Sequence, residues 1–320
     1  MGCVALRRPP PSPPRDSLGE MSTDRVVQPM VACLGYPVAG DPTQFVMSRI
    51  AREACLDWRF FTSQVEPEQF ETAFRGVQAL GLSGLSILEP FQQPAVSLLK
   101  SLSNQASLLG RVSVARREED GWVGDHTQGS ALMQLLRARL GGHSLREDGT
   151  MSPQSILVRG SRLAAEMLEG LTTTLEGDFR VLSFKNGDPD PDPSASKSTA
   201  DDSTASTVQT VGYDELSALE RPVRVLLFDG ASMAQQPGKA KSLTKWLQQI
   251  AWATSPVVVC THGRQQLDEG ALEWLKGRDV PIVEELELMA YRAAVDFHFW
   301  TEYEPSIELI RESLEEYLQW

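Results

Sequence analysis

Two series of short apolar strands that alternate with helices constrain the fold of this chain more than any other feature. The first series runs from Val26 to a hairpin around Asp120-Gly121, and the second begins at Gln154. Apolar strands bounded by helices predict buried parallel sheets, and an Asp-Gly pair between short strands predicts a hairpin turn. A length of 320 residues also favours two domains. The sequence therefore predicts a two-domain α/β protein.

The first series is expected to form one compact α/β unit. Its helices are expected where apolar residues recur at helical spacing, and Pro67 suits the first turn of the clearest one. Its strands are expected at 26–34, 57–65 and 84–88, and its helices at 43–56, 67–80, 94–102 and 129–140.

The second series is interrupted by a polar insertion. Residues 187–210 consist almost only of Asp, Pro, Ser, Thr and Ala, with no apolar period, and are expected to be disordered. Strands are expected at 155–160, 179–185, 223–229, 256–260 and 281–285, and helices at 162–173, 213–220, 241–253, 271–276, 286–300 and 305–320.

Composition excludes several classes of function. The net charge of −13 argues against a nucleic-acid or anionic membrane surface, which needs clustered Lys and Arg. No apolar run reaches the roughly 18 residues that a membrane span requires. The four cysteines show no CxxC spacing, which favours reduced thiols in a cytoplasmic protein and no metal site.

The first 23 residues differ from the rest. The stretch "RRPPPSPPR" has too many prolines and too little apolar surface to pack, so residues 1–23 are expected to be disordered. The segment lacks the apolar core of a secretory signal. Met21 is an alternative start of the protein.

Four local strings resemble the motifs of one family, the shikimate dehydrogenases. They follow the family's order and spacing from about Val26 to Trp320, although many polar letters differ. The strings are "GYPVAGDPTQ" at 35–44, "PEQFETAFRGVQALGLSGLSILEPFQQPAVSLL" at 67–99, "LLGRVSVARREEDGWVGDHTQG" at 108–129 and "ELELMAYRAAVDFHFWT" at 285–301.

The resemblance implies a domain plan and a reaction. Residues 24–128 would bind the substrate, and 129–150 would be a connecting helix and linker. Residues 151–285 would form a Rossmann-type doubly wound domain for NADP, and helices in 286–320 would return to the first domain. The family reaction is the NADP-dependent interconversion of 3-dehydroshikimate and shikimate in aromatic amino acid biosynthesis.

The resemblance also assigns site residues, several of them changed. The family's catalytic lysine and aspartate fall on Gln92 and Gln128. The substrate-binding positions fall on Asp41, Thr43, Ser86, Ser113 and Arg292. The family's glycine-rich nucleotide turn becomes "RGSRLA" at 159–164, and the cofactor-binding positions fall on Gly160, Ser161, Arg162 and Lys185.

Glutamine changes the chemistry at the two catalytic positions. Reduction of a ketone leaves an oxyanion that must gain a proton, and a glutamine amide has no usable pKa. Loss of proton-transfer assistance typically lowers a rate by roughly 10²–10⁴-fold. Asp41, Asp125 and His126 are candidates to substitute, although His126 is expected to be a partly exposed residue at a helix start.

Three hypotheses follow. The first is a non-catalytic or strongly impaired homologue that senses a ligand or binds a partner. Its ligand would be a small acid such as shikimate or an analogue. The second is an active NADP(H)-dependent oxidoreductase on a different hydroxy or keto acid, with Arg292 as a two-pronged carboxylate clamp. The third is a structural subunit of a heteromeric complex with 305–320 as its interface. A homodimer also remains open.

Overall fold

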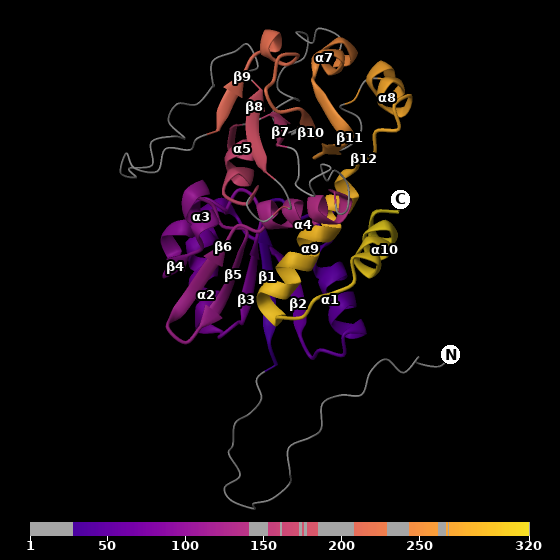
Figure 1. Ribbon diagram of the computed structural model, residues 1–320. Coiled ribbons are helices and arrows are strands. Elements are labelled where there is room, and N and C mark those ends of the chain that lie inside the picture. The colour runs from indigo at the N-terminus through magenta and orange to yellow at the C-terminus, as the bar shows by residue number, and fades with distance from the viewer. Residues whose placement is uncertain are drawn as a thin grey trace, which may run out of the picture.

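The computed structural model describes residues 28–140, 153–160, 162–172, 175, 178–184, 208–228, 243–261, 267 and 269–319. This part of the chain forms two sheets of six strands each, one from each of the two series in the sequence. Figure 1 shows the sheets one above the other, with helices around both. The expected fold class, two α/β domains of which the second is Rossmann-type, is confirmed.

The first sheet has the strand order β2-β1-β3-β5-β6-β4. Strand β1 pairs parallel with β2 and β3, and β5 and β6 form the predicted antiparallel hairpin. Its elements are β1 (Met30–Gly35), α1 (Thr43–Glu53), β2 (Arg59–Gln64), α2 (Phe70–Ala79), β3 (Gly84–Ile87), β4 (Ser101–Leu102), α3 (Asn104–Leu109), β5 (Val114–Glu118) and β6 (Gly121–Asp125).

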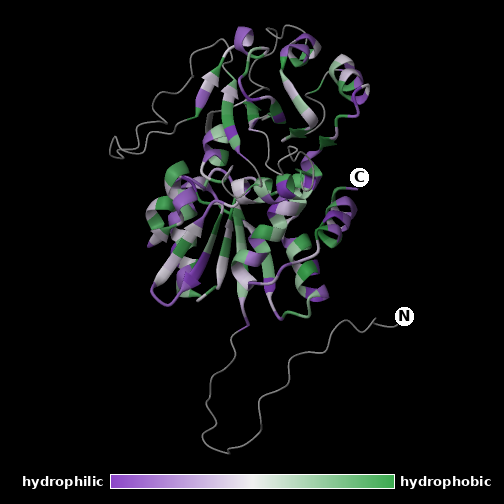
Figure 2. Cartoon of the chain, in the orientation of Figure 1, coloured by the Kyte–Doolittle hydropathy of each residue, from purple (hydrophilic) through white to green (hydrophobic). Residues whose placement is uncertain are grey.

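Both faces of the first sheet are covered, because successive residues of a strand point to opposite sides. On β1, Ala32 belongs to the core beneath α2, with Phe74 of that helix. The neighbouring Val31 belongs to the core on the other face, with Met47 and Ile50 of α1. In Figure 2 hydrophobic residues run along the inner strands of this sheet.

The second sheet has the strand order β12-β11-β10-β7-β8-β9, and all its pairs are parallel. The order reverses between β7 and β10, which makes this pair the topological switch point of the sheet. Its elements, with the helix α4 that leads into it, are α4 (Gln128–Leu140), β7 (Gln154–Arg159), α5 (Arg162–Glu169), β8 (Phe179–Phe184), β9 (Gln209–Val211), β10 (Val223–Phe228), α7 (Leu243–Gln249), β11 (Trp252–Cys260), α8 (Glu269–Lys276) and β12 (Ile282–Val283).

Two helices at the C-terminal end return to the first sheet. They are α9 (Glu285–Thr301) and α10 (Ile307–Leu318), and Figure 1 shows α10 beside α1. Trp300 of α9 donates its Nε1 proton to the Ala115 carbonyl at 3.0 Å. A Cβ atom at Gly84 would lie 2.5 Å from Trp300 Cδ1, so only glycine allows this close contact.

The expectation of one helix at 94–102 is wrong. A 3₁₀ helix at Pro94–Leu98 is followed by β4 and then by α3. Lys100 N donates to the Trp122 carbonyl at 2.9 Å, which draws the segment onto β6. Ser103 accepts a hydrogen bond from Ala106 N and so begins a new helix.

Three boundaries in the second series also differ from expectation. The helix expected at 213–220 is a 3₁₀ turn at Tyr213–Glu215. Buried Leu216 follows, and its carbonyl accepts from Ala251 N. The helix expected at 241–253 ends earlier, at Gln249 of α7, because the next strand already begins at Trp252. The insertion expected to end at 210 ends earlier, because β9 pairs with β8; its residues 187–207 lie outside the described part.

Among the residues that the structure describes, none of the helices has the length and apolar character needed to cross a bilayer.

Candidate functional site

A cavity of about 90 Å³ opens beside the carboxyl ends of β1 and β3, beneath α9. Ligands of open α/β sheets bind in this kind of crevice. Four of the five expected substrate-binding residues line it, which are Asp41, Thr43, Ser86 and Arg292. The other lining residues are Pro42, Val46, Met47, Leu88, Met289, Ala293, Asp296 and Leu314.

The loop between β1 and α1 supplies one wall of this cavity. Asp41 Oδ1 accepts a hydrogen bond from Thr43 N at 3.0 Å, which holds the carboxylate at the start of α1. Cys33 Sγ lies 3.7 Å from the same oxygen. Burial, together with the charge of Asp41, raises the pKa of Cys33 to about 12. The thiol therefore stays neutral at physiological pH.

Helix α9 supplies the opposite wall and carries two charged side chains. Arg292 and Asp296 lie one turn apart, with Arg292 Nε 3.8 Å from Asp296 Oδ2. Burial raises the pKa of Asp296 to about 6, while Arg292 and Thr127 act against that rise. The Arg292 side chain is 32% exposed, so water still screens its charge.

Two hydroxyl groups form a chain of hydrogen bonds that ends at Asp296. Thr127 Oγ1 donates to Asp296 Oδ1, and Ser113 Oγ lies 3.0 Å from Thr127 Oγ1. Because the single Thr127 hydroxyl proton goes to Asp296, Ser113 is the donor in the second bond. Ser113, the fifth expected substrate-binding residue, therefore contributes through Thr127 and does not line the cavity.

Gln92 and Gln128 also lie outside the cavity lining. Gln92 is buried, and its Nε2 donates to the Ile87 carbonyl at 3.3 Å. Its Oε1 accepts from Arg111 Nη2 at 3.3 Å, and Arg111 also pairs with Glu89. Both ends of the amide are thus bound, one to the end of β3 and the other to the turn before β5. Gln128 is the first residue of α4.

His126 is buried, so the expectation of a partly exposed residue is wrong. Hydrogen bonds from the next residue, Thr127, to Ser113 and Asp296 draw this turn beneath α9. Burial, and then the charges of Arg292 and Arg111, lower the pKa of His126 to about 4. The imidazole is therefore neutral at physiological pH.

Asp125 faces away from the cavity lining and toward its own loop. Its Oδ1 accepts from His126 N at 2.7 Å and from the Ser103 hydroxyl. These bonds hold the carboxylate at the turn between β6 and α4. Of Asp41, Asp125 and His126, the three candidates expected to act as an acid or base, only Asp41 lines the cavity.

The expected cofactor-binding residues are described only in part. Gly160 follows the last residue of β7, and Arg162 is the first residue of α5. Ser161 and Lys185 lie outside the described residues. The side chain that precedes this turn, Arg159, is buried at the end of β7.

Sequence reasoning missed Asp296 and gave Thr127 no role. The available signal was spacing, because Asp296 follows Arg292 by four residues on a helix that carries the expected substrate-binding arginine. The part played by Thr127 depends on a contact across 169 residues of sequence, which no local pattern indicates.

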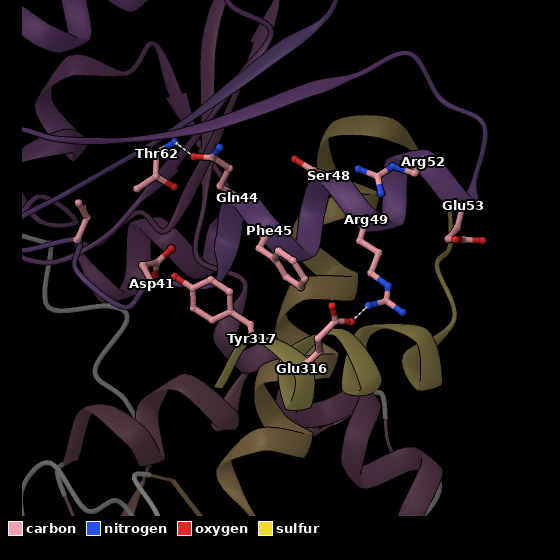
Figure 3. A pocket seen from close by; sticks show the side chains of 11 residues that line it. Asp41, Gln44, Phe45, Ser48, Arg49, Arg52, Glu53, Thr62, Glu316 and Tyr317 are labelled. Atoms are coloured by element: carbon pink, nitrogen blue, oxygen red, sulfur yellow. Dashed lines mark hydrogen bonds and ion pairs between the residues drawn. The ribbon is translucent and has the colours of Figure 1, made fainter. Parts of the chain in front are cut away.

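A larger open groove of about 740 Å³ adjoins the cavity at Asp41. Figure 3 shows it between α1 and α10, with the rings of Phe45 and Tyr317 at its centre. Arg49 pairs with Glu316 across it. The other charged groups on its walls, Arg52 and Glu53, are exposed. The small cavity instead holds the buried carboxylate of Asp296, so we take the small cavity as the candidate site.

Comparisons with known proteins point to one family. Residues 33–114 match the model of the "Shikimate dehydrogenase substrate binding domain". Shikimate dehydrogenase (NADP(+)) of Bacillus licheniformis is 24% identical over 286 residues, which cover 89% of this chain and 96% of the relative.

Solved structures show the same fold. Shikimate 5-dehydrogenase from Listeria monocytogenes, in complex with shikimate and NAD, aligns with a TM-score of 0.69 at 17% identity and covers 91% of this chain and 99% of its own. The ligand-free 5-ketofructose reductase of Gluconobacter aligns with a TM-score of 0.68 at 16% identity and covers 91% and 99%.

Proposed function

Because the chain belongs to the shikimate dehydrogenase family, we propose that it is a member without shikimate dehydrogenase turnover. In this proposal the cavity beneath α9 binds a small carboxylic acid, and binding rather than catalysis is its function. The chain then acts as a ligand-sensing or partner-binding protein.

The main observation that supports this proposal is the environment of Gln92. The family's lysine and aspartate fall on Gln92 and Gln128, and neither residue lines the cavity. The Gln92 amide is bound to Ile87 at the end of β3 and to Arg111 before β5. An amide held in this way neither carries a charge to a reacting oxygen nor exchanges a proton with it. We therefore expect a rate at least roughly 10²-fold below that of an ordinary member.

The cavity still offers groups that recognise an acid. The guanidinium of Arg292 presents a planar fork of donors that suits a carboxylate. Thr43 and Ser86 place hydroxyls on the same cavity, where they can bond the hydroxyl groups of a ligand. Apolar side chains such as Met47 and Met289 fill the remaining wall. This composition, a few polar groups on an apolar lining, is typical of small-molecule sites.

The first experiment measures NADP(+)-dependent oxidation of shikimate by the purified full chain, with the Bacillus licheniformis enzyme as reference. We expect a rate at least roughly 10²-fold below the reference. The double variant Q92K/Q128D is expected to gain activity, whereas Q93K/Q128D, with the lysine one position away, is not. Wild-type turnover within about tenfold of the reference enzyme would falsify the proposal.

A second experiment tests ligand binding separately. Isothermal titration with shikimate is expected to give heat with the wild type and none with R292M. The exposed arginine variant R75M serves as the matched control, because Arg75 pairs only with Glu71 on the surface of α2. Binding that survives in R292M would show that the acid is held elsewhere.

One observation favours a second candidate function, an active oxidoreductase on a different acid. Asp296 lies on the cavity, and burial raises its pKa to about 6. A carboxyl group with that pKa can give a proton to an oxygen in the cavity at mildly acidic pH. Screening a panel of keto acids with NADPH at pH 5.5 tests this candidate. Activity that disappears in D296N would support it, and absence of turnover with every acid would remove it.

A further inference from the structure

The open groove between α1 and α10 continues to the point where the chain enters the first sheet. Gln28, the first described residue, donates from its side-chain amide to Asp57 just before β2. Asp57 lies on an open hollow of about 600 Å³, which shares Ser48 and Arg52 with the groove. The hollow and the groove therefore follow α1 from the entry of the chain to Asp41 at the candidate site.

Two aromatic rings lie in the middle of this groove. The ring centres of Phe45 on α1 and Tyr317 on α10 are 5.4 Å apart, and Phe45 is 36% exposed. Figure 3 shows both rings between Asp41 at one end of the groove and Glu53 at the other. Aromatic-lined grooves bind proline-rich segments, because a polyproline II helix is already ordered and loses little entropy on binding.

The charges on the groove favour a basic segment. Three carboxylates and two arginines line it, which gives a net charge of −1. Among the described residues Arg49 pairs with Glu316, whereas Asp41 and Glu53 form no ion pair. Asp41 lies just before α1 and Glu53 is its last residue, so the two unpaired carboxylates mark the ends of an 11-residue helix about 16 Å long.

The chain itself carries a segment with matching chemistry. Residues 7–15, "RRPPPSPPR", hold five prolines between arginines and no acidic residue. In a polyproline II helix, which rises 3.1 Å per residue, Arg8 and Arg15 are about 22 Å apart. Two arginine side chains are long enough to fit this span to the carboxylates at the ends of α1.

The connection from this segment to the described chain is long enough for the contact. Residues 16–27 separate Arg15 from Gln28 and span up to about 40 Å when extended. Gln28 contacts Asp57, which follows Glu53 by four residues. Arg15 therefore reaches Glu53, and the prolines before it can then follow α1 toward the candidate site.

We propose that residues 7–15 dock in the groove between α1 and α10 of the same molecule. The arginines at the two ends of the segment meet the two unpaired carboxylates, and its prolines pack on the two aromatic rings. The docked segment covers the groove as far as Asp41, which also lines the cavity beneath α9. This contact does not depend on the proposed function.

Trypsin cleavage after Arg15 measures the docking, because a protease cuts the segment mainly while it is undocked. The reference is a synthetic peptide of residues 5–24 at the same concentration, and mass spectrometry of the released fragment follows the cut. We expect the bond after Arg15 to be cut roughly tenfold more slowly in the full chain than in the peptide, because the tether gives the segment a high effective concentration at the groove.

Aromatic variants distinguish docking from general shielding of the segment. F45L should lose most of the protection against trypsin. F61L is the matched control and should keep it, because Phe61 is 38% exposed but does not line the groove. P10A/P11A, in the segment itself, should also lose most of the protection, because two proline rings are removed.

Two neighbouring residues at the end of α1 should act in opposite directions. Arg52 and Glu53 both line the groove and are exposed, so their substitution leaves the core intact. E53Q removes a partner of the basic segment and should lower the protection about twofold to threefold, whereas R52E removes a repelling charge and should raise it by a similar factor.

Four results would overturn the proposal. They are cleavage of the wild type as fast as that of the peptide, equal protection in F45L and the wild type, equal protection in E53Q and R52E, and protection that increases with protein concentration. The last result would place the segment on a second copy of the chain. If F45L fails to fold, the two charge variants still decide the outcome.

Discussion

Two arginines of this protein lie in opposite electrostatic surroundings. Arg292, on the cavity beneath α9, has Asp296 on the next turn of its own helix, at 3.8 Å, and its side chain is 32% exposed. Arg159, at the end of β7, is 8% exposed and has no carboxylate partner among the described residues. The charge of Arg292 is balanced by Asp296 and by water, whereas no carboxylate of the described residues balances the charge of Arg159.

This difference indicates what each site needs from a ligand. A charge that the chain already balances can bind an acid and still be stable without it. A buried charge without a partner destabilises the free protein, and an anion that binds it stabilises the folded state. The cavity beneath α9 is thus balanced without a ligand, whereas the end of β7 carries a buried charge that the described residues leave unpaired.

The largest expected effect comes from Asp296. Its pKa in the folded protein, about 6, is raised above the ordinary 3.8. Its contribution to stability is therefore fully present below about pH 3.8 and is lost as the pH rises through about 6. Relative to D296N, which cannot ionise, the wild type should lose about 3 kcal/mol of unfolding free energy between pH 4 and pH 8.

Urea unfolding of both proteins across this pH range measures the effect. The control is D120N, the same substitution at a side chain that is 91% exposed. A difference between wild type and D296N that stays constant with pH would show that the cavity does not raise the pKa of Asp296.

A smaller effect is expected at Thr127. T127V keeps the shape but removes the hydroxyl, so Asp296 Oδ1 loses its donor and the Ser113 hydroxyl loses its acceptor. Buried groups left unsatisfied cost about 1–3 kcal/mol. T301V is the control on α9, because the Thr301 hydroxyl bonds only backbone groups within the described part of the chain, donating to the Phe297 carbonyl and accepting from Tyr303 N. Urea unfolding measures the loss of unfolding free energy in both variants. Equal losses would contradict a specific contribution of the Thr127 bond to Asp296.

The smallest effect concerns the loop after β3. Q92L removes the bonds of the amide to Ile87 and Arg111 and should lower the unfolding free energy by about 1 kcal/mol. Q93L, at the exposed neighbouring position, should change it by less than about 0.5 kcal/mol. If the two variants were equally stable, the Gln92 amide would not be held by Ile87 and Arg111 as described.

Much of this fold was predictable from apolar periodicity. The hairpin at Asp120-Gly121, helix α2 and the parallel strands of the second sheet all follow from local patterns. The segment after Pro94 was not predictable, because its apolar residues fit a helix equally well. Its real structure depends on the bond from Lys100 N to Trp122 on a distant strand.

The site was predictable only where its residues belong to recognisable strings. Asp41, Thr43, Ser86 and Arg292 come together on one cavity as expected. The burial of His126 and the support of Asp296 by Thr127 arise from contacts between α9 and the turn before α4. Such contacts join residues more than a hundred positions apart, so no local sequence pattern predicts them.

The most direct test of the contrast between the two arginines is the unfolding free energy of R292M and R159M, measured side by side at pH 8 in phosphate-free chloride buffer. R292M leaves ionised Asp296 without its counter-charge and should lose about 1–2 kcal/mol, a value discounted for solvent screening. R159M removes an unpaired buried charge and should be unchanged or more stable by about 1 kcal/mol, even after losing its stacking on Trp246. Losses of similar size in both variants would contradict the account, because both arginines would then be balanced by the chain.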